Sequence, residues 1–141
     1  MPRQRHLSYG LPLLTVMAFG CGTSSPFDYQ PTSGTITYED GQPISPGGLE
    51  LCFAAQVESP DGEAYPRTAI AHVDGSGKFN EVTSYKFGDG LIPGKHKVFI
   101  KSGAGPDGKP LVSKEYASVD STPLLVDSSS TDVLEIKVPR P

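Results

Sequence analysis

A cysteine at the end of a short apolar run is the residue whose type and position most clearly point to chemistry. Arg3 and Arg5 precede an apolar run over residues 11–19, and Gly20 then leads into Cys21. The run is too short to span a bilayer, but it has the length of an export-signal core. A small residue directly before a cysteine indicates a signal in which the cysteine thiol accepts a diacylglycerol. After cleavage, this cysteine becomes the mature N-terminus.

The residues around Cys21 resemble a lipoprotein signal in a slightly unusual form. Such signals prefer leucine where Ala18 stands and a small residue where Phe19 stands. The alternative is an ordinary export signal that is cleaved close to Gly20. We therefore expect an exported protein whose partner is the cell membrane, through lipid on Cys21, in a periplasmic or surface-facing position.

Composition predicts three segments and one folded domain. These are a signal peptide over 1–20, a flexible tether over 21–32 and a β-domain over 33–138. The segment before Cys21 contains two arginines and no acidic residue, so the formal net charge of −4 becomes −6 after its removal. A mildly acidic domain without a basic stripe is a poor partner for nucleic acid.

Cysteine usage predicts a fold that depends on its hydrophobic core. Cys21 and Cys52 are the two cysteines of the chain, and lipid on the first leaves the second without a partner. Cys52 alternates with apolar residues in a strand-like run. We interpret it as a small apolar residue in a sheet face rather than a reactive thiol.

Short runs of β-forming residues alternate with turns along the whole domain. The 16 glycines and 14 prolines lie between these runs rather than in one cluster. The predicted strands cover residues 35–38, 49–53, 68–73, 78–82, 95–101, 114–116, 123–126 and 133–138. We expect 68–73 and 78–82 to form a hairpin around Asp74–Gly77, and His96, Val98 and Ile100 to face inward. Seven or eight such strands predict an all-β sandwich.

Several turn and strand motifs recur in a known family. They are Ser33–Tyr38 with Gly41–Ile44, Val73–Phe79, and Ile92–Val98. These motifs resemble carboxypeptidase-regulatory-like, transthyretin-like domains, including those of exported lipoproteins in planctomycete-type bacteria, which also end with a segment like 116–124. The resemblance covers nearly all of 33–138. It implies a seven-stranded sandwich that serves as an accessory or binding module without catalytic residues.

The chain departs from this family at two positions and lacks the features of an enzyme. His96 stands where the family usually has tyrosine, and Ser76 replaces an acidic residue. A hydroxyisourate hydrolase with the same fold uses several histidines, an arginine and a C-terminal Tyr-Arg-Gly-Ser. This chain ends Lys-Val-Pro-Arg-Pro over 137–141. We therefore expect no catalytic residues and treat a hydrolase as an unfavoured alternative.

The candidate metal ligands are too few for a predicted site. The turn at Asp74–Gly77 resembles a shortened calcium loop but lacks the carboxylates that calcium requires. Asp127 and Asp132 flank a polar segment that we interpret as a solvated turn. His72 and His96 offer two imidazoles without a third ligand nearby in sequence. We expect no metal and no cofactor.

Four aromatic residues in or beside loops are the candidate binding residues. They are Tyr65, Tyr85, Phe87 and Tyr116. Loop aromatics on a rigid sandwich suit a carbohydrate or peptide surface, and the alternative is that they cap the ends of the core. The sequence thus favours a non-enzymatic, lipid-anchored envelope protein that contacts envelope proteins or polysaccharide. A carbohydrate-binding module that uses these aromatics is the second hypothesis.

Overall fold

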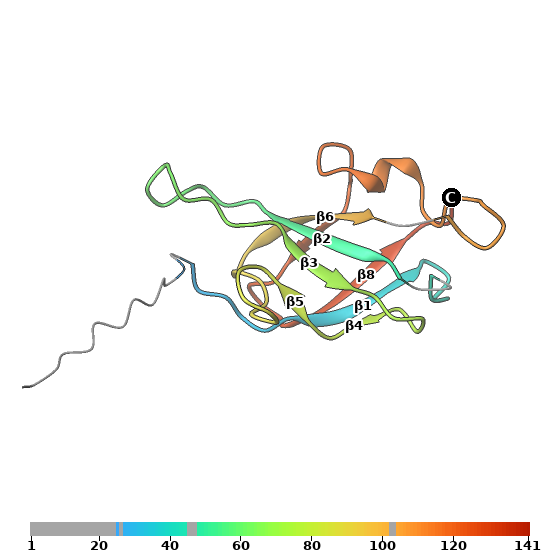
Figure 1. The fold of residues 1–141 in the computed structure, drawn as a ribbon, viewed down its shortest axis with the longest axis horizontal. Coiled ribbons are helices and arrows are strands. Elements are labelled where there is room, and N and C mark those ends of the chain that lie inside the picture. The colour runs from blue at the N-terminus through green and yellow to red at the C-terminus, as the bar shows by residue number, and fades with distance from the viewer. Residues whose placement is uncertain (1–24, 26, 45–47, 102–103) are drawn as a thin grey trace, which may run out of the picture.

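The computed structural model is an all-β sandwich of two facing sheets (Figure 1). It describes residue 25 and residues 27–44, 48–101 and 104–141, so the predicted signal peptide and Cys21 lie outside the described residues. The three-stranded sheet has the order β4-β1-β8, and the five-stranded sheet has the order β5-β3-β2-β6-β7. The predicted fold class is confirmed.

Eight strands and one short 3₁₀ helix make up the described domain. Their bounds are β1 Ser33–Tyr38, β2 Glu50–Ala55, β3 Ala69–His72, β4 Lys78–Phe79, β5 Val82–Thr83, β6 Lys95–Lys101, η1 Lys114–Ala117, β7 Leu125–Asp127 and β8 Val133–Val138. Nearly all pairs are antiparallel. The pair β1–β8 is parallel, with Ser33 opposite Val133 and Tyr38 opposite Val138.

The strands bury the faces that their alternation predicts. In β6, His96, Val98 and Ile100 are buried between the sheets, while the two residues between them are half-buried and the two terminal lysines are exposed. In β8 the even-numbered residues are buried and the odd-numbered residues are exposed. Successive side chains of a strand point to opposite faces, so each strand contributes every second residue to one shared core.

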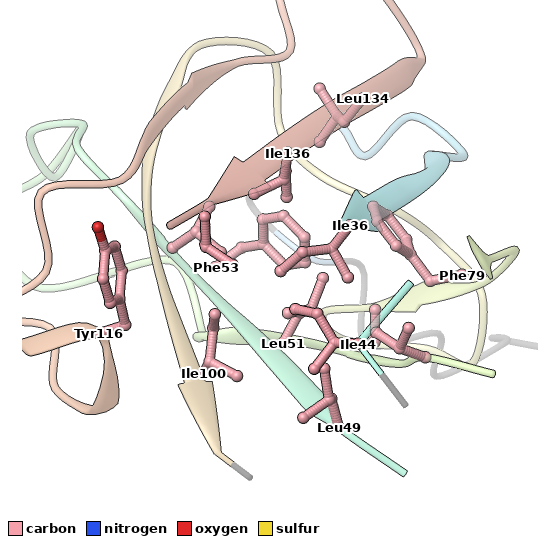
Figure 2. Packing of buried hydrophobic residues seen from close by; sticks show 14 of the residues in the cluster. Ile36, Ile44, Leu49, Leu51, Phe53, Phe79, Ile100, Tyr116, Leu134 and Ile136 are labelled. Carbon is pink, nitrogen blue, oxygen red and sulfur yellow. The ribbon is translucent and has the colours of Figure 1, made fainter. Parts of the chain in front are cut away.

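The core joins the two sheets through large apolar side chains (Figure 2). The rings of Phe53 in β2 and Phe79 in β4 lie 6.0 Å apart between centroids and are tilted by 52°. Both side chains are fully buried, and each contributes roughly 1.5–3 kcal/mol to folding through the removal of apolar surface from water. These two rings therefore connect strands of different sheets.

The predicted hairpin of 68–73 with 78–82 is wrong. The turn itself forms, and the Asp74 N–H donates to the Lys78 carbonyl at 2.9 Å. After it, β4 leaves β3 and pairs with β1 in the opposite sheet, and β5 then returns to pair with β3. Phe79 and Val82 are three residues apart and both buried, which a single alternating strand does not allow. The chain therefore changes sheets between them.

Gly34 permits this change of sheet because it leaves space for the Phe79 ring. Gly34 lies opposite Phe79 in the β1–β4 ladder. A Cβ atom at Gly34 would stand 2.7 Å from the ring and would overlap the Leu134 carbonyl oxygen. Any side chain at this position would push β4 or β8 away from β1.

The segment 114–116 is helical rather than extended, which corrects the prediction. A 3₁₀ turn covers Lys114–Ala117, and the Tyr116 N–H donates to the Ser113 carbonyl at 3.0 Å. This turn directs the Tyr116 ring onto the core, close to Ile100 (Figure 2). Glu115 and Ala117, on either side of Tyr116, stay exposed.

The packed domain begins at Gln30, three residues before the expected boundary at Ser33. Gln30 exchanges two backbone hydrogen bonds with Leu91, at 2.8 and 3.0 Å, and Thr32 is buried. Gly90 has a φ of +92°, and a Cβ there would collide with the Gln30 backbone. The last three residues of the expected 21–32 tether therefore belong to the sandwich.

We expect Gly34→Ala to lower the free energy of unfolding by roughly 1–3 kcal/mol, because the new methyl group overlaps the Phe79 ring and the Leu134 carbonyl. Urea unfolding followed by circular dichroism measures the change. The matched control is Thr35→Ala on the same strand, with an expected loss below about 1 kcal/mol. Equal losses in the two variants would show that Gly34 is not a point of close packing.

Candidate functional site

The structure separates the four predicted aromatic residues into exposed and buried members. Phe87 is 80% exposed and Tyr65 is 67% exposed, whereas Tyr85 is half-buried. Tyr116 is 5% exposed and belongs to the core, so it is corrected from a ligand-binding residue to a core cap. It packs beside β6, which β3 and β2 separate from the β5 side of the sheet.

The loop that carries Tyr85 and Phe87 is organised by one carboxylate. Asp89 Oδ1 accepts the Ser84 N–H at 2.8 Å, and Asp89 Oδ2 accepts the N–H groups of Tyr85 and Lys86 at 3.0 and 2.8 Å. Three backbone donors therefore converge on one side chain. Charge-assisted hydrogen bonds of this kind are roughly twice as strong as neutral ones.

Two hydroxyl groups hold the same loop at its ends. The Ser84 hydroxyl donates to the Gly90 carbonyl at 2.6 Å, and the Thr83 hydroxyl accepts the Gly88 N–H at 3.0 Å. Gly88 adopts a φ of +70°, a region that glycine enters without strain. The exposed Phe87 ring therefore stands on a loop whose backbone is fixed before any ligand arrives.

A cation–π contact connects the loop between β2 and β3 to the loop over residues 84–90, named here the Phe87 loop. The Arg67 guanidinium carbon lies 4.9 Å from the centroid of the Tyr85 ring. Such contacts contribute about 0.5–1 kcal/mol at exposed sites. Tyr65 stands two residues before Arg67 on the same segment. The structure thus connects the segments that carry Tyr65, Tyr85 and Phe87, while Tyr116 lies elsewhere.

Phe87 forms one wall of an open hollow of about 620 Å³ beside β3 and β5. Ile70 supplies further apolar surface, and the remaining lining groups are polar or charged. The hollow, named here the Phe87 hollow, is lined by Ile70, His72, Asp74, Lys78, Asn80, Glu81, Thr83 and Phe87. It combines an aromatic wall with hydrogen-bond donors and acceptors of both signs.

The sequence indicated Phe87 but not the hollow around it. Ile70 and Thr83 become neighbours because β5 pairs with β3, and Asn80 and Glu81 lie where the chain crosses between sheets. The predicted hairpin would instead have placed 78–82 beside 68–73. The spacing of Phe79 and Val82, both apolar and three residues apart, was the signal that argued against it.

One carboxylate oxygen of Asp74 accepts hydrogen bonds from residues of its own turn. Asp74 Oδ1 accepts the Ser76 N–H at 2.9 Å, the Ser76 hydroxyl at 2.6 Å and the Lys78 N–H at 3.0 Å. The Ser76 hydroxyl bond is the largest cause that lowers the pKa of Asp74, followed by the Lys78 N–H bond. Within the described residues, no group of three or more metal-ligating side chains is found.

The two strand histidines lie too far apart to act together. His72 pairs opposite Glu50 at one end of β2, and His96 pairs opposite Ala55 at the other end. His72 is exposed on the outer face of the sheet, whereas His96 is 1% exposed on the inner face. They cannot coordinate one ion.

His96 is held in its neutral form by burial. Its Nδ1 lies 3.0 Å from the Gly94 carbonyl oxygen, so in the neutral ring the proton belongs on Nδ1. Burial lowers the pKa of His96, and the hydrogen bond to Gly94 and the charge of Asp127 oppose this effect in part. Protonation of His96 therefore costs more in the folded state than in the unfolded chain.

Cys52 lies on the outer face of the five-stranded sheet and is still only 1% exposed. Ile70 and Phe99 stand opposite it on the two neighbouring strands. Burial raises the pKa of the Cys52 thiol, and the nearby positive charge of Lys101 opposes this effect. The thiol is thus kept in the protonated form, which is the poor nucleophile.

Comparison with family models, with curated proteins and with solved structures finds no match for this chain. Within the described residues, no helix has the length and apolar character needed to cross a membrane.

We expect the stability of the protein to fall as the pH decreases from about 6.5, the ordinary pKa of histidine, toward the lower pKa of folded His96. In this window the unfolded chain binds the proton and the folded state does not, so acid favours unfolding. The free energy of unfolding, measured by urea titration at a series of pH values between 7 and 5, checks this.

The variant His96→Gln removes this proton-binding difference and is expected to flatten the pH dependence. His72→Gln is the matched control, since His72 is exposed, and its pH dependence is expected to follow that of the unmodified protein. The same slope in His96→Gln and in the unmodified protein would show that His96 does not govern stability in this range.

Proposed function

We propose that this protein is an exported, lipid-anchored module of the cell envelope that binds a saccharide at the Phe87 hollow and catalyses no reaction. The observation that carries the proposal is the position of Phe87. Its ring is 80% exposed on a loop that Asp89 fixes, beside a concave surface with polar groups of both signs. An exposed ring on a rigid loop is available for stacking on a ligand.

The lining of the hollow favours a neutral, hydroxyl-rich ligand. Lys78 and the Asn80 amide offer hydrogen-bond donors to a ligand, whereas Asp74, Glu81 and the Asn80 oxygen offer acceptors. Two carboxylates against one lysine disfavour a multiply charged anion such as a nucleic acid. A sugar ring offers an apolar face for the Phe87 ring and hydroxyl groups for both donors and acceptors. Such a pairing of apolar wall and few polar groups is typical of small-ligand sites.

Binding rather than catalysis is proposed because the hollow offers no activated hydroxyl or thiol nucleophile. A hydroxyl or thiol acts as a nucleophile when it lies within hydrogen-bond reach of a base that is itself oriented. The one hydroxyl in the lining belongs to Thr83, and it accepts the Gly88 N–H. Cys52 is buried opposite Ile70 on the neighbouring strand and is not part of the lining.

The proposal retains the resemblance to carboxypeptidase-regulatory-like, transthyretin-like domains. That resemblance implies an accessory sandwich of short strands, and two facing sheets of such strands are compatible with it. It also retains the anchor at Cys21. Because Gln30 is already paired with Leu91, nine residue steps separate the anchor from the sandwich. A fully extended chain of this length reaches at most about 30 Å, which would hold the domain near the membrane surface.

We expect the protein to bind glycans on an array of bacterial envelope saccharides, and Phe87→Ala to weaken that binding roughly tenfold or more through loss of the stacking ring. Isothermal titration calorimetry with the best array glycan measures the change. The matched control is Leu125→Ala, since Leu125 is 55% exposed on β7, at the opposite edge of the same sheet.

The result for Tyr65→Ala distinguishes the Phe87 hollow from a wider aromatic surface, because Tyr65 does not line the hollow. We expect this variant to keep most of its affinity. A silent array with the unmodified protein, or full affinity in Phe87→Ala, would contradict the proposed site.

We expect expression in a bacterial host to yield a membrane-bound protein whose intact mass includes a lipid at Cys21. The variant Cys21→Ser should lose both the added mass and the membrane association, because the serine hydroxyl is a poorer nucleophile than the thiol for transfer of the diacylglyceryl group. Intact-mass spectrometry and membrane fractionation measure the two effects. A soluble protein cleaved near Gly20 without added mass would instead indicate ordinary secretion.

A further inference from the structure

The outer edge of β8 is an unpaired strand edge within the described residues. β8 lies at the end of the order β4-β1-β8. On its inner edge the Ser33 N–H donates to the Asp132 carbonyl, and the Glu39 N–H donates to the Val138 carbonyl, both at 2.9 Å. Even-numbered residues of β8 therefore direct their backbone groups toward β1. The backbone groups of the odd-numbered residues point away from the sheet.

The open part of this edge is two residues long. At its start, the Thr131 hydroxyl accepts the Val133 N–H at 3.1 Å and donates to the Val133 carbonyl at 3.0 Å, so the groups of Val133 are satisfied. At its end, Pro139 has no N–H to donate. Glu135 and Lys137 lie between these limits, and no described residue pairs with their backbone groups.

The N–H and C=O groups of Glu135 and Lys137 are self-complementary when two β8 strands pair in one antiparallel register. When two copies of β8 meet with Ile136 opposite Ile136 of the second copy, Glu135 of each copy lies opposite Lys137 of the other. Each such pair exchanges two backbone hydrogen bonds, so all the open N–H and C=O groups of Glu135 and Lys137 in both copies are used. Neither Val133 nor Pro139 is needed.

The side chains select the same register. Glu135 and Lys137 project from the outer face of the sheet, with side chains that are 72% and 52% exposed. In this register two Glu–Lys pairs form between the copies. A shift of two residues in either direction places Glu135 opposite Glu135 or Lys137 opposite Lys137. Opposite charges directly across a strand pair are stabilising, and like charges are destabilising.

We propose that a second copy of this chain pairs with β8 in this register and forms a two-fold symmetric dimer with a continuous six-stranded sheet. The proposal is independent of the saccharide site, which lies beside β3 and β5 in the other sheet. A single strand pair buries less surface than a standard stable interface, so the dimer is weak and concentration-dependent.

Charge reversal at Glu135 and Lys137 tests whether these two residues face each other across the dimer. Sedimentation equilibrium measures the dimer dissociation constant of the exported protein carrying Cys21→Ser, which removes the effect of lipid. In this background, Glu135→Lys alone and Lys137→Glu alone each place like charges in both cross-strand pairs. We expect each to weaken dimerisation roughly tenfold or more.

Two combinations are expected to restore the dimer. The double variant Glu135→Lys with Lys137→Glu recovers opposite charges in both pairs. A one-to-one mixture of the two single variants does so as well, because each Lys of one copy then faces a Glu of the other. Each single variant also removes the ion pair within one copy, in which Lys137 Nζ lies 3.3 Å from Glu135 Oε1. Because both side chains are exposed, such a pair contributes little to stability, so unchanged circular dichroism and a nearly unchanged melting temperature are expected in every variant.

Three outcomes would overturn the proposal. The first is an unmodified protein that stays monomeric at millimolar concentration. The second is a dimer whose dissociation constant is the same in both single variants. The third is a loss of dimer that neither the double variant nor the mixture restores, which would point to a different surface or to pairing with a strand of another protein.

Discussion

The position of the Phe79 ring determines much of the rest of the structure. Phe79 packs against Phe53 across the core, and its strand reaches the three-stranded sheet because Gly34 leaves the space it needs. Because this ring is buried against the three-stranded sheet, β4 pairs with β1 and does not pair with β3. The vacant edge of β3 is then taken by β5. The Phe87 hollow is thus a consequence of core packing rather than a separate addition to the fold.

Many aspartates of this domain shape its loops by accepting backbone N–H groups, namely Asp40, Asp61, Asp74, Asp89, Asp107 and Asp127. Asp61 accepts the backbone N–H groups of Glu63 and Ala64, and Asp89 accepts three backbone N–H groups in the Phe87 loop. The pKa of Asp61 is lowered chiefly by the backbone bonds from Ala64 and Glu63. The pKa of Asp127 is lowered chiefly by the bond from the Ser129 hydroxyl. A loop-rich domain with no α-helix among its described residues must satisfy many backbone groups in this way, so these aspartates have a structural role.

The two sheets offer different surfaces for interaction. The five-stranded sheet carries the Phe87 hollow near its β5 edge, where a rigid loop and a change of sheet create concave surface. The three-stranded sheet ends at β8, whose backbone is open over a short window between Thr131 and Pro139. These surfaces use different physical means, namely side-chain recognition at the hollow and backbone pairing at the edge. Occupation of one does not require a change in the other.

The sequence by itself determined which side chains are buried in the regular strands. Alternation in 95–101 assigned the inward residues correctly, and the predicted ranges 95–101 and 133–138 coincide with β6 and β8. This is possible because the period of two is a local property of extended backbone. The sandwich class follows from the same local signals, repeated along the chain.

Only the tertiary structure decided which strands are partners. The segment 78–83 divides between two sheets, Gln30 joins the domain through Leu91, and Tyr116 turns into the core from a 3₁₀ helix. In each case the deciding contact comes from a segment far away along the chain, such as Gly34 for Phe79. Local propensity describes how a segment can bury its apolar residues, but the partner against which it does so is set by the packing of the whole core.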